Sequence, residues 1–303
     1  MSKPQHKIDI KKLQTLILTW LKKELDQDGY SKIESAFNSI LRGTEDWEVY
    51  SSFSGVPRYT GKNLISLSDD DKESAEKLRT GWKPGYWHVD QLGRTLLILA
   101  ISERSKDEFL DKLEKIFITS DMREAEALYQ SLPVLPYPKE LTERAAEGVR
   151  SNITSVFNAI AHHNPYPADY MDEDAFNQIV LKALFVDSPL YKIQGLNRRA
   201  NKKLAKMLIE YAHERWSAGR LISPELWRPV GPYIDESSIE EIKKVLNETD
   251  IIHQYAATLA LKSSDSDAAK KLLDQNKDLL TSIEEQELTW EEIGKKLGKN
   301  GKI

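Results

Sequence analysis

Polar side chains between residues 172 and 186 stand where a helix normally places apolar ones. At 100° steps the apolar residues of this segment point to every side, which indicates a helix that is buried all round. Gln178 and Lys182 nevertheless lie four residues apart on one face, and Asn177 adds a second amide. A buried amide without a partner costs about 1–3 kcal/mol, and a buried ammonium costs more. These side chains therefore either pair inside the protein or line a cavity that holds a polar ligand.

A cation lies on the apolar stripe of the next long helix, predicted over 201–218. Arg215 falls beside Tyr211 in projection, so it must meet a carboxylate, backbone carbonyls or an anionic ligand. A structural salt bridge between stacked helices is the alternative. His213 and Glu214 lie towards opposite edges of the stripe.

Further cations flank this helix on both sides. Arg198 and Arg199 precede its start, and two adjacent arginines before a helix N-terminus suit a phosphate or a carboxylate. Arg220 follows Gly219, which closes the helix. The alternative for all three cations is a solvated loop position.

Two adjacent histidines, His162 and His163, end the helix before this region. The helix dipole favours cations there and Pro165 stops further helix, so both histidines have a structural explanation. A metal site would need His213 and Glu214 as distant ligands, and adjacent histidines on a helix point in different directions. We therefore predict no metal.

Helical periodicity extends along nearly the whole chain. Ser68, followed by three aspartates, is typical of a capped helix start, and 91–102 is apolar enough to be a buried helix. We expect one long helix over 141–162, bent near Gly148.

The fold class that follows is all-α, with no significant sheet. Short loops between helices imply antiparallel neighbours, which favours an α-solenoid of stacked helical hairpins of the HEAT or armadillo type. Three regions are expected within one continuous helical domain: an N-terminal region (1–120), a central region (121–235) and a C-terminal helical-repeat region (236–303).

Composition excludes several classes of function. The net charge of −5 is spread without a basic block, so we expect no nucleic-acid binding. The chain has no cysteine, which excludes a disulfide framework, a thiolate zinc site and a cysteine nucleophile. The segment 13–21 is too short and too polar to enter a membrane, so a cytoplasmic location is expected. No phosphate loop, HExxH or nucleophile elbow occurs, and we predict no cofactor.

Five short motifs occur in order over about 65 residues of the middle of the chain. They are HNPYPA (163–168), NQIVLKALF (177–185), GLNRRAN (195–201), YAHERWSAGR (211–220) and PELWR (224–228). Together they resemble the EboA-domain family. Asn197 stands where relatives are expected to have aspartate, and Lys202 where they are expected to have proline.

The resemblance implies a part in making or moving a bacterial secondary metabolite, beside a membrane prenyltransferase-like protein and other enzymes. The family brings no established catalytic residues. The leading hypothesis is a helical scaffold that binds a metabolite precursor or a partner protein of the same gene cluster at the cluster between residues 177 and 220. The cations would meet an acidic group, and Tyr211, Trp216 and Trp227 would cover an apolar one. The alternatives are an enzyme of unknown reaction, with His213 or His163 as general base and Lys182 or Arg215 stabilising negative charge, and a purely structural protein–protein adaptor.

The candidate ligand-binding residues are polar or aromatic side chains of the motifs: His163, Asn177, Gln178, Lys182, Arg198, Arg199, Tyr211, His213, Glu214, Arg215, Arg220 and Trp227.

Overall fold

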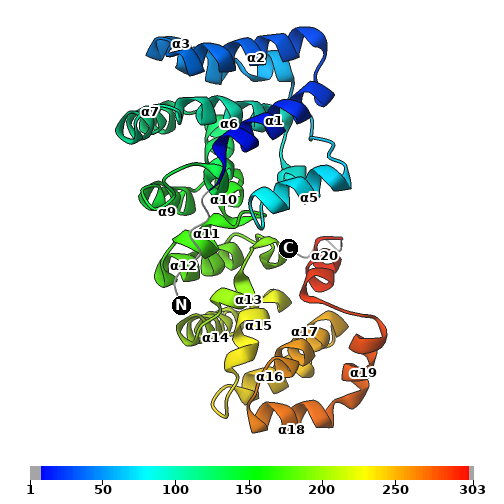
Figure 1. Ribbon diagram of the computed structural model, residues 1–303. Coiled ribbons are helices and arrows are strands. Elements are labelled where there is room, and N and C mark those ends of the chain that lie inside the picture. The colour runs from blue at the N-terminus through cyan, green and yellow to red at the C-terminus, as the bar shows by residue number, and fades with distance from the viewer. Residues whose placement is uncertain (1–7, 300–303) are drawn as a thin grey trace. The chain divides into compact units, whose positions relative to one another are not determined.

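The computed structural model describes residues 8–299, which form helices joined by short turns (Figure 1). Within these residues there is no strand, and Leu64 and His88 make an isolated antiparallel bridge. The all-α prediction is therefore confirmed, while the HEAT- or armadillo-type stacking stays a prediction. None of the helices between 8 and 299 combines the length and apolar character that crossing a membrane requires. The chain divides into two compact units, with the boundary between Met171 and Asp172.

The first unit holds helices α1 to α11, with two single-turn 3₁₀ helices between them. In chain order these are α1 (Ile10–Glu24), α2 (Gln27–Arg42), α3 (Asp46–Gly55), α4 (Pro57–Thr60), α5 (Asp69–Leu78), η1 (Pro84–Tyr86), α6 (Val89–Ile101), α7 (Lys106–Thr119), α8 (Met122–Ser131), η2 (Leu132–Val134), α9 (Thr142–Arg150), α10 (Thr154–Ala161) and α11 (Tyr166–Tyr170).

Helix α6 is the core of the first unit. Every one of its residues is buried, as the apolar run in 91–102 predicted, and α1, α2 and α8 pack against it. The predicted helix start at Ser68 is also confirmed. Its hydroxyl accepts from the Asp71 N–H, while the Asp71 carboxylate accepts from the Ser68 N–H, which forms a capping box.

The expected long helix over 141–162 is wrong, because the chain forms α9 and α10 instead. Ser151 and Ile153 leave the helical conformation, with ψ values of 133° and 110°. Serine and asparagine bond to their own backbone and favour such breaks, which explains why Ser151 and Asn152 separate two helices.

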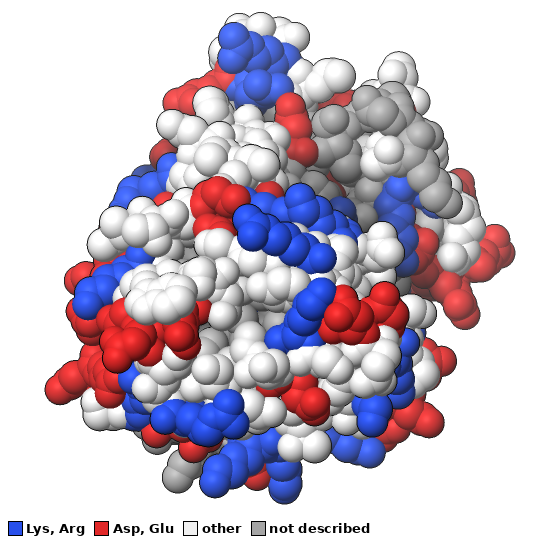
Figure 2. All heavy atoms as spheres, turned by 90° about the horizontal axis from the view of Figure 1, so that it is seen from above, with Lys and Arg blue, Asp and Glu red and all other residues white. Residues whose placement is uncertain are grey.

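Charged side chains of opposite sign intermingle on the face drawn in Figure 2. Ion pairs also form between neighbouring side chains along one helix, such as Lys72 with Asp69 at 2.8 Å. Exposed pairs of this kind contribute about 0–1 kcal/mol each, so they add solubility more than stability.

The second unit holds helices α12 to α20. In chain order these are α12 (Glu173–Phe185), η3 (Leu190–Lys192), α13 (Leu196–Arg199), α14 (Lys202–Ser217), η4 (Pro224–Leu226), α15 (Trp227–Val230), η5 (Gly231–Tyr233), α16 (Ile239–Leu246), α17 (Ile251–Lys262), α18 (Asp267–Gln275), α19 (Lys277–Glu285) and α20 (Trp290–Lys299). Helix α17 is central, since α15, α16, α18, α19 and α20 all contact it.

The prediction that 172–186 is buried on all sides is wrong. In α12, Gln178 is exposed and Phe185 keeps 76% of its surface accessible, whereas Phe176 and Val180 are fully buried. Apolar residues on every side of a helix do not force burial on every side, because folded proteins leave much apolar surface in contact with water. The helix therefore has a solvent edge that periodicity did not reveal.

Candidate functional site

A cavity of about 260 Å³ opens in the first unit, where η1, the start of α6, α8 and the end of α10 meet. We call it the histidine pocket. Its lining residues are Tyr86, His88, Gln91, Glu126, Gln130, Ser155, Asn158, Ala159, His162 and His163. Three imidazoles, one carboxylate and several amides thus converge, while none of these residues is lysine or arginine. This chemistry suits a neutral or cationic molecule that forms hydrogen bonds.

The first wall of the pocket is fixed by the start of α6. His88 is the N-cap residue, and its backbone N–H donates to the Gln91 side-chain oxygen at 2.8 Å. The same oxygen lies 3.2 Å from Nδ1 of the His88 ring. The amide of Gln91 therefore orients the imidazole as well as capping the helix.

The opposite wall depends on the turn that follows α10. The Asn164 side chain donates to the carbonyls of Tyr129 and Ala159, both at 3.1 Å, and accepts from the Tyr166 N–H at 3.0 Å. His163 adopts a left-handed backbone conformation, with φ of 51°. Such a conformation is uncommon outside glycine and costs about 1–3 kcal/mol, so the surrounding bonds must hold it in place.

This strained turn sets the His163 ring parallel to the ring of Tyr86. The ring centroids lie 3.6 Å apart and the planes are within 4°. The ring of His162, one residue earlier, also lines the pocket and stands at 66° to that of His163. The stacked rings of His163 and Tyr86 form a flat polar edge to the pocket.

Gln130 of α8 adds a polar group whose hydrogen bonding is incomplete. Its side-chain oxygen is buried and has no hydrogen-bond partner in the part of the chain that the structure describes. A buried acceptor without a partner costs about 1–3 kcal/mol. Because Gln130 lines the histidine pocket, its side-chain oxygen is a candidate acceptor for a hydrogen-bond donor bound there.

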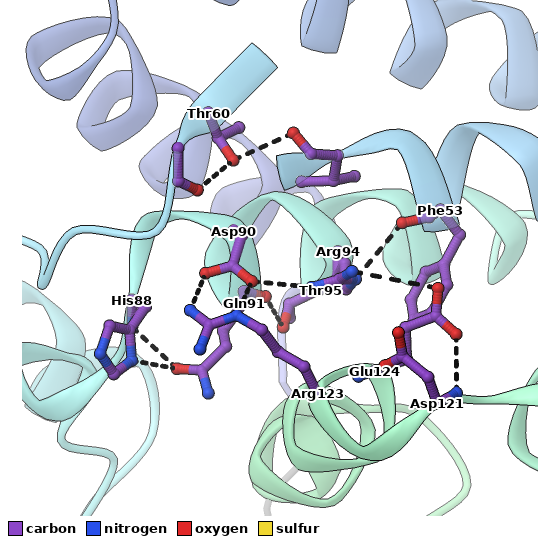
Figure 3. Close-up of polar contacts among 12 residues, drawn as sticks. Phe53, Thr60, His88, Asp90, Gln91, Arg94, Thr95, Asp121, Arg123 and Glu124 are labelled. Atoms are coloured by element: carbon purple, nitrogen blue, oxygen red, sulfur yellow. Dashed lines mark hydrogen bonds and ion pairs between the residues drawn. The ribbon is translucent and has the colours of Figure 1, made fainter. Parts of the chain in front are cut away.

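An ion network behind the pocket holds α6 against α8 (Figure 3). Arg123 of α8 donates from two nitrogens to the Asp90 carboxylate, at 2.8 and 2.7 Å. Arg94 donates to the same carboxylate at 2.8 Å, and its other terminal nitrogen lies 3.9 Å from Glu124. Since α6 and α8 carry lining residues of the pocket, this network fixes the distance between two of its walls.

The sequence-predicted candidates other than His163 lie in the second unit, where several of them form hydrogen bonds with neighbouring residues. The Asn201 side chain donates to the side-chain oxygen of Asn177 at 2.9 Å. Arg199 donates to the Asp172 carbonyl at 2.7 Å, and its guanidinium lies over the ring of Phe176. Asn177 therefore has an internal partner, whereas Arg199, for which a solvated loop position was the alternative, is half-buried.

Candidate side chains of helix α14 also form hydrogen bonds with other parts of the protein. Arg215 donates from two nitrogens to the Leu221 carbonyl, at 3.0 and 2.9 Å, and so closes the C-terminal turn. His213 lies 2.9 Å from Glu241, and the Tyr211 hydroxyl donates to the Leu184 carbonyl at 3.3 Å. Arg215 meets a backbone carbonyl, one of the three partners expected for it.

The remaining candidates differ in burial. Lys182 is half-buried, and loss of hydration lowers the pKa of its ammonium. Trp227 is fully buried and stacks on Trp216 with a ring separation of 6.1 Å. Five of the candidates are exposed: Gln178, Arg198, His213, Glu214 and Arg220.

A buried acid that the sequence reasoning missed lies beside Trp227. Glu225 is only 1% exposed, and one of its oxygens accepts from the Leu190 N–H at 3.0 Å. Its other oxygen is buried without a partner among the described residues. Burial raises the pKa of the Glu225 carboxyl to about 7. The acid stands inside the PELWR motif, so its place in that motif was the available signal.

Tyr86, His88, Glu126 and Gln130 were also missed. They come from η1, α6 and α8 and meet only through the packing of these elements, so helical projection of one segment cannot find them. Across residues 8–299, no three histidine or acidic side chains are arranged to hold a metal ion.

A family model described as metabolite traffic protein EboA matches residues 13–231. This chain belongs to the EboA family. The match includes the histidine pocket, Glu225 and all five motifs, and it ends at the start of η5. No curated protein and no solved structure matches this EboA chain.

Proposed function

We propose that this EboA protein binds a small, ring-shaped metabolite with hydrogen-bond donors in the histidine pocket, as a step in the making or export of a bacterial secondary metabolite. The observation that carries the proposal is His163, whose strained backbone presents its ring, stacked on Tyr86, at the pocket edge. A strained backbone conformation persists only where the surrounding fold holds it, and such residues cluster at functional sites. The flat ring pair suits a ring, and the imidazoles and amides suit hydroxyl or amine groups.

Phenol and anisole test this proposal as a matched pair, since only phenol has a donor. We expect phenol to shift the imidazole NMR signals of His88 and His163 with a dissociation constant of about 1 mM, or roughly 4 kcal/mol. Anisole should bind at least several-fold more weakly, because it cannot donate to an imidazole or to Gln130.

The variants His163→Ala and Gln130→Leu should each weaken phenol binding. Gln27→Leu is the matched control, since Gln27 is an exposed residue of α2 in the same unit. Equal shifts with phenol and anisole, or unchanged binding in both variants, would count against a site for hydrogen-bond donors.

A partner-binding role for the second unit is the second candidate function. Phe185 and Leu221 expose 76% and 80% of their surfaces. Tyr211 and Arg215, one helical turn apart, bond to the carbonyls of Leu184 and Leu221, which places the backbone before Phe185 and that of Leu221 near the C-terminal half of α14. An exposed apolar pair of this kind suits contact with another protein.

Proteins that co-purify with the chain from its native host test this second role. We expect a partner to be retained by the wild type and lost with the double variant Phe185→Ser, Leu221→Ser. Ile251→Ser is the control, because Ile251 is another exposed apolar residue of the second unit. Equal retention by the double variant and the control would remove the candidate.

A further inference from the structure

A second cavity of the first unit, about 580 Å³ in volume, lies beside the segment 135–140. We call it the tyrosine–proline groove, after Pro136, Tyr137, Pro138 and Tyr170. Its other lining residues are Ile8, Ile10, Ser102, Leu135, Lys139 and Glu140. The volume falls within the range of small-molecule sites, which are mostly apolar with a few placed polar groups.

The floor of the groove is a rigid turn. Tyr137 adopts a left-handed conformation with φ of 55°, and prolines on both sides restrict the backbone further. The Glu140 N–H donates to the Tyr137 carbonyl at 3.0 Å, and the Tyr166 hydroxyl donates to the Pro138 carbonyl at 2.5 Å. Both non-glycine residues with positive φ among the described residues of this unit, Tyr137 and His163, therefore line cavities.

The lining of the groove includes two aromatic rings, those of Tyr137 and Tyr170. Phe109 supports the Tyr137 ring from behind, at a centroid distance of 5.9 Å, and the Lys106 ammonium lies 5.5 Å from the same ring. Tyr170 packs on the buried ring of Tyr166 at 5.1 Å. Since each ring packs on a neighbouring ring, Tyr137 and Tyr170 can supply apolar contact area at little cost in side-chain entropy.

The rim of the groove carries charged side chains of both signs, Lys139 and Glu140. Glu140 is engaged by Lys106, and this contact lowers the pKa of the Glu140 carboxyl. Lys139 is exposed and forms no ion pair within residues 8–299. Lys139 can therefore meet an anionic group at the edge of the groove.

We propose that the tyrosine–proline groove is a separate binding site for a flat aromatic acid. The ring system lies between the tyrosine and proline side chains, and the anionic group meets Lys139. This ligand class differs from that of the histidine pocket, whose lining residues include no lysine or arginine. The two sites can therefore be tested, and can fail, independently.

The anionic dye 1-anilinonaphthalene-8-sulfonate and its neutral analogue N-phenyl-1-naphthylamine test the site. We expect one equivalent of each dye to bind with enhanced fluorescence. Lys139→Ala should weaken the anionic dye about fivefold and leave the neutral dye unchanged, since an exposed ion pair contributes about 1 kcal/mol. Lys62→Ala is the matched control, because Lys62 is also exposed and also unpaired within residues 8–299.

A second variant separates the groove from other apolar surface. Ile10→Trp places a large side chain in the groove at the first residue of α1, and it should lower the affinity for both dyes at least tenfold. Ile118→Trp, at an exposed position outside the groove, should have no effect. Unchanged binding of both dyes in Ile10→Trp would overturn the proposal, as would equal losses in Lys139→Ala and Lys62→Ala.

Discussion

Replacing Asp90 by alanine is expected to lower the free energy of unfolding of the first unit by about 3–5 kcal/mol. The Asp90 carboxylate is fully buried and accepts from both Arg94 and Arg123. Arg94 is itself 2% exposed, and loss of hydration lowers its pKa. Without Asp90, its remaining contacts include the Phe53 carbonyl at 3.3 Å, the Phe53 ring and the more distant Glu124. The cost follows from a buried guanidinium left without its main counter-charge.

Urea unfolding combined with hydrogen exchange of the α6 amides measures this loss, because a chain with two units need not unfold in one step. Asp70→Ala is the matched control: Asp70 is an exposed acid at the start of α5, and its loss should change stability by less than about 0.5 kcal/mol. Asp90→Asn, which keeps an acceptor but not the charge, should fall between the two. A loss below about 1 kcal/mol in Asp90→Ala would mean that the network contributes little.

The second unit is expected to lose stability as the pH rises from about 5 to about 8, because of Glu225. Burial raises the pKa of this carboxyl from 4.5 to about 7 in the folded chain. Between these values the folded state holds a proton that the unfolded state has released, so raising the pH favours unfolding. A pKa difference of this size corresponds to about 3 kcal/mol in the free energy of unfolding. This contribution is fully lost once the pH exceeds the pKa of the folded state.

The variant Glu225→Gln isolates this contribution. Glutamine keeps an oxygen that can accept from the Leu190 N–H but does not titrate, so the pH-dependent loss should disappear. Glu214→Gln, at an exposed position of α14, should retain the wild-type profile. Hydrogen exchange in α15 and α17 at several pH values gives the comparison. Parallel profiles for the wild type and Glu225→Gln would show that the carboxyl ionises at its ordinary pKa.

Helix formation in this protein was largely readable from the sequence. Local signals decide it: the Ser68 capping box and the apolar run of α6 are both contained within a few consecutive residues. The break between α9 and α10 was missed because Ser151 and Asn152 are only weakly disfavoured in helices. The hydrophobic periodicity alone predicted a continuous helix through both residues.

The candidate site was only partly predictable. His163 was identified from its motif, but its partner in the ring stack, Tyr86, lies 77 residues earlier, and no pattern within one helix connects them. The amide of Asn177 was correctly expected to need a partner, yet whether that partner was a ligand or Asn201 depended on how α12 and α14 pack.

The sequence by itself determined an all-helical chain, its kinship with the EboA family and the polar residues that require explanation. Helix propensity, capping and motif identity are local properties, which is why they could be read without coordinates. Tertiary packing alone decided that α12 has a solvent edge, that Arg215 meets a backbone carbonyl and that three imidazoles share one pocket. Burial and convergence depend on which distant segments meet, and that information lies in the packing of the helices rather than in any one of them.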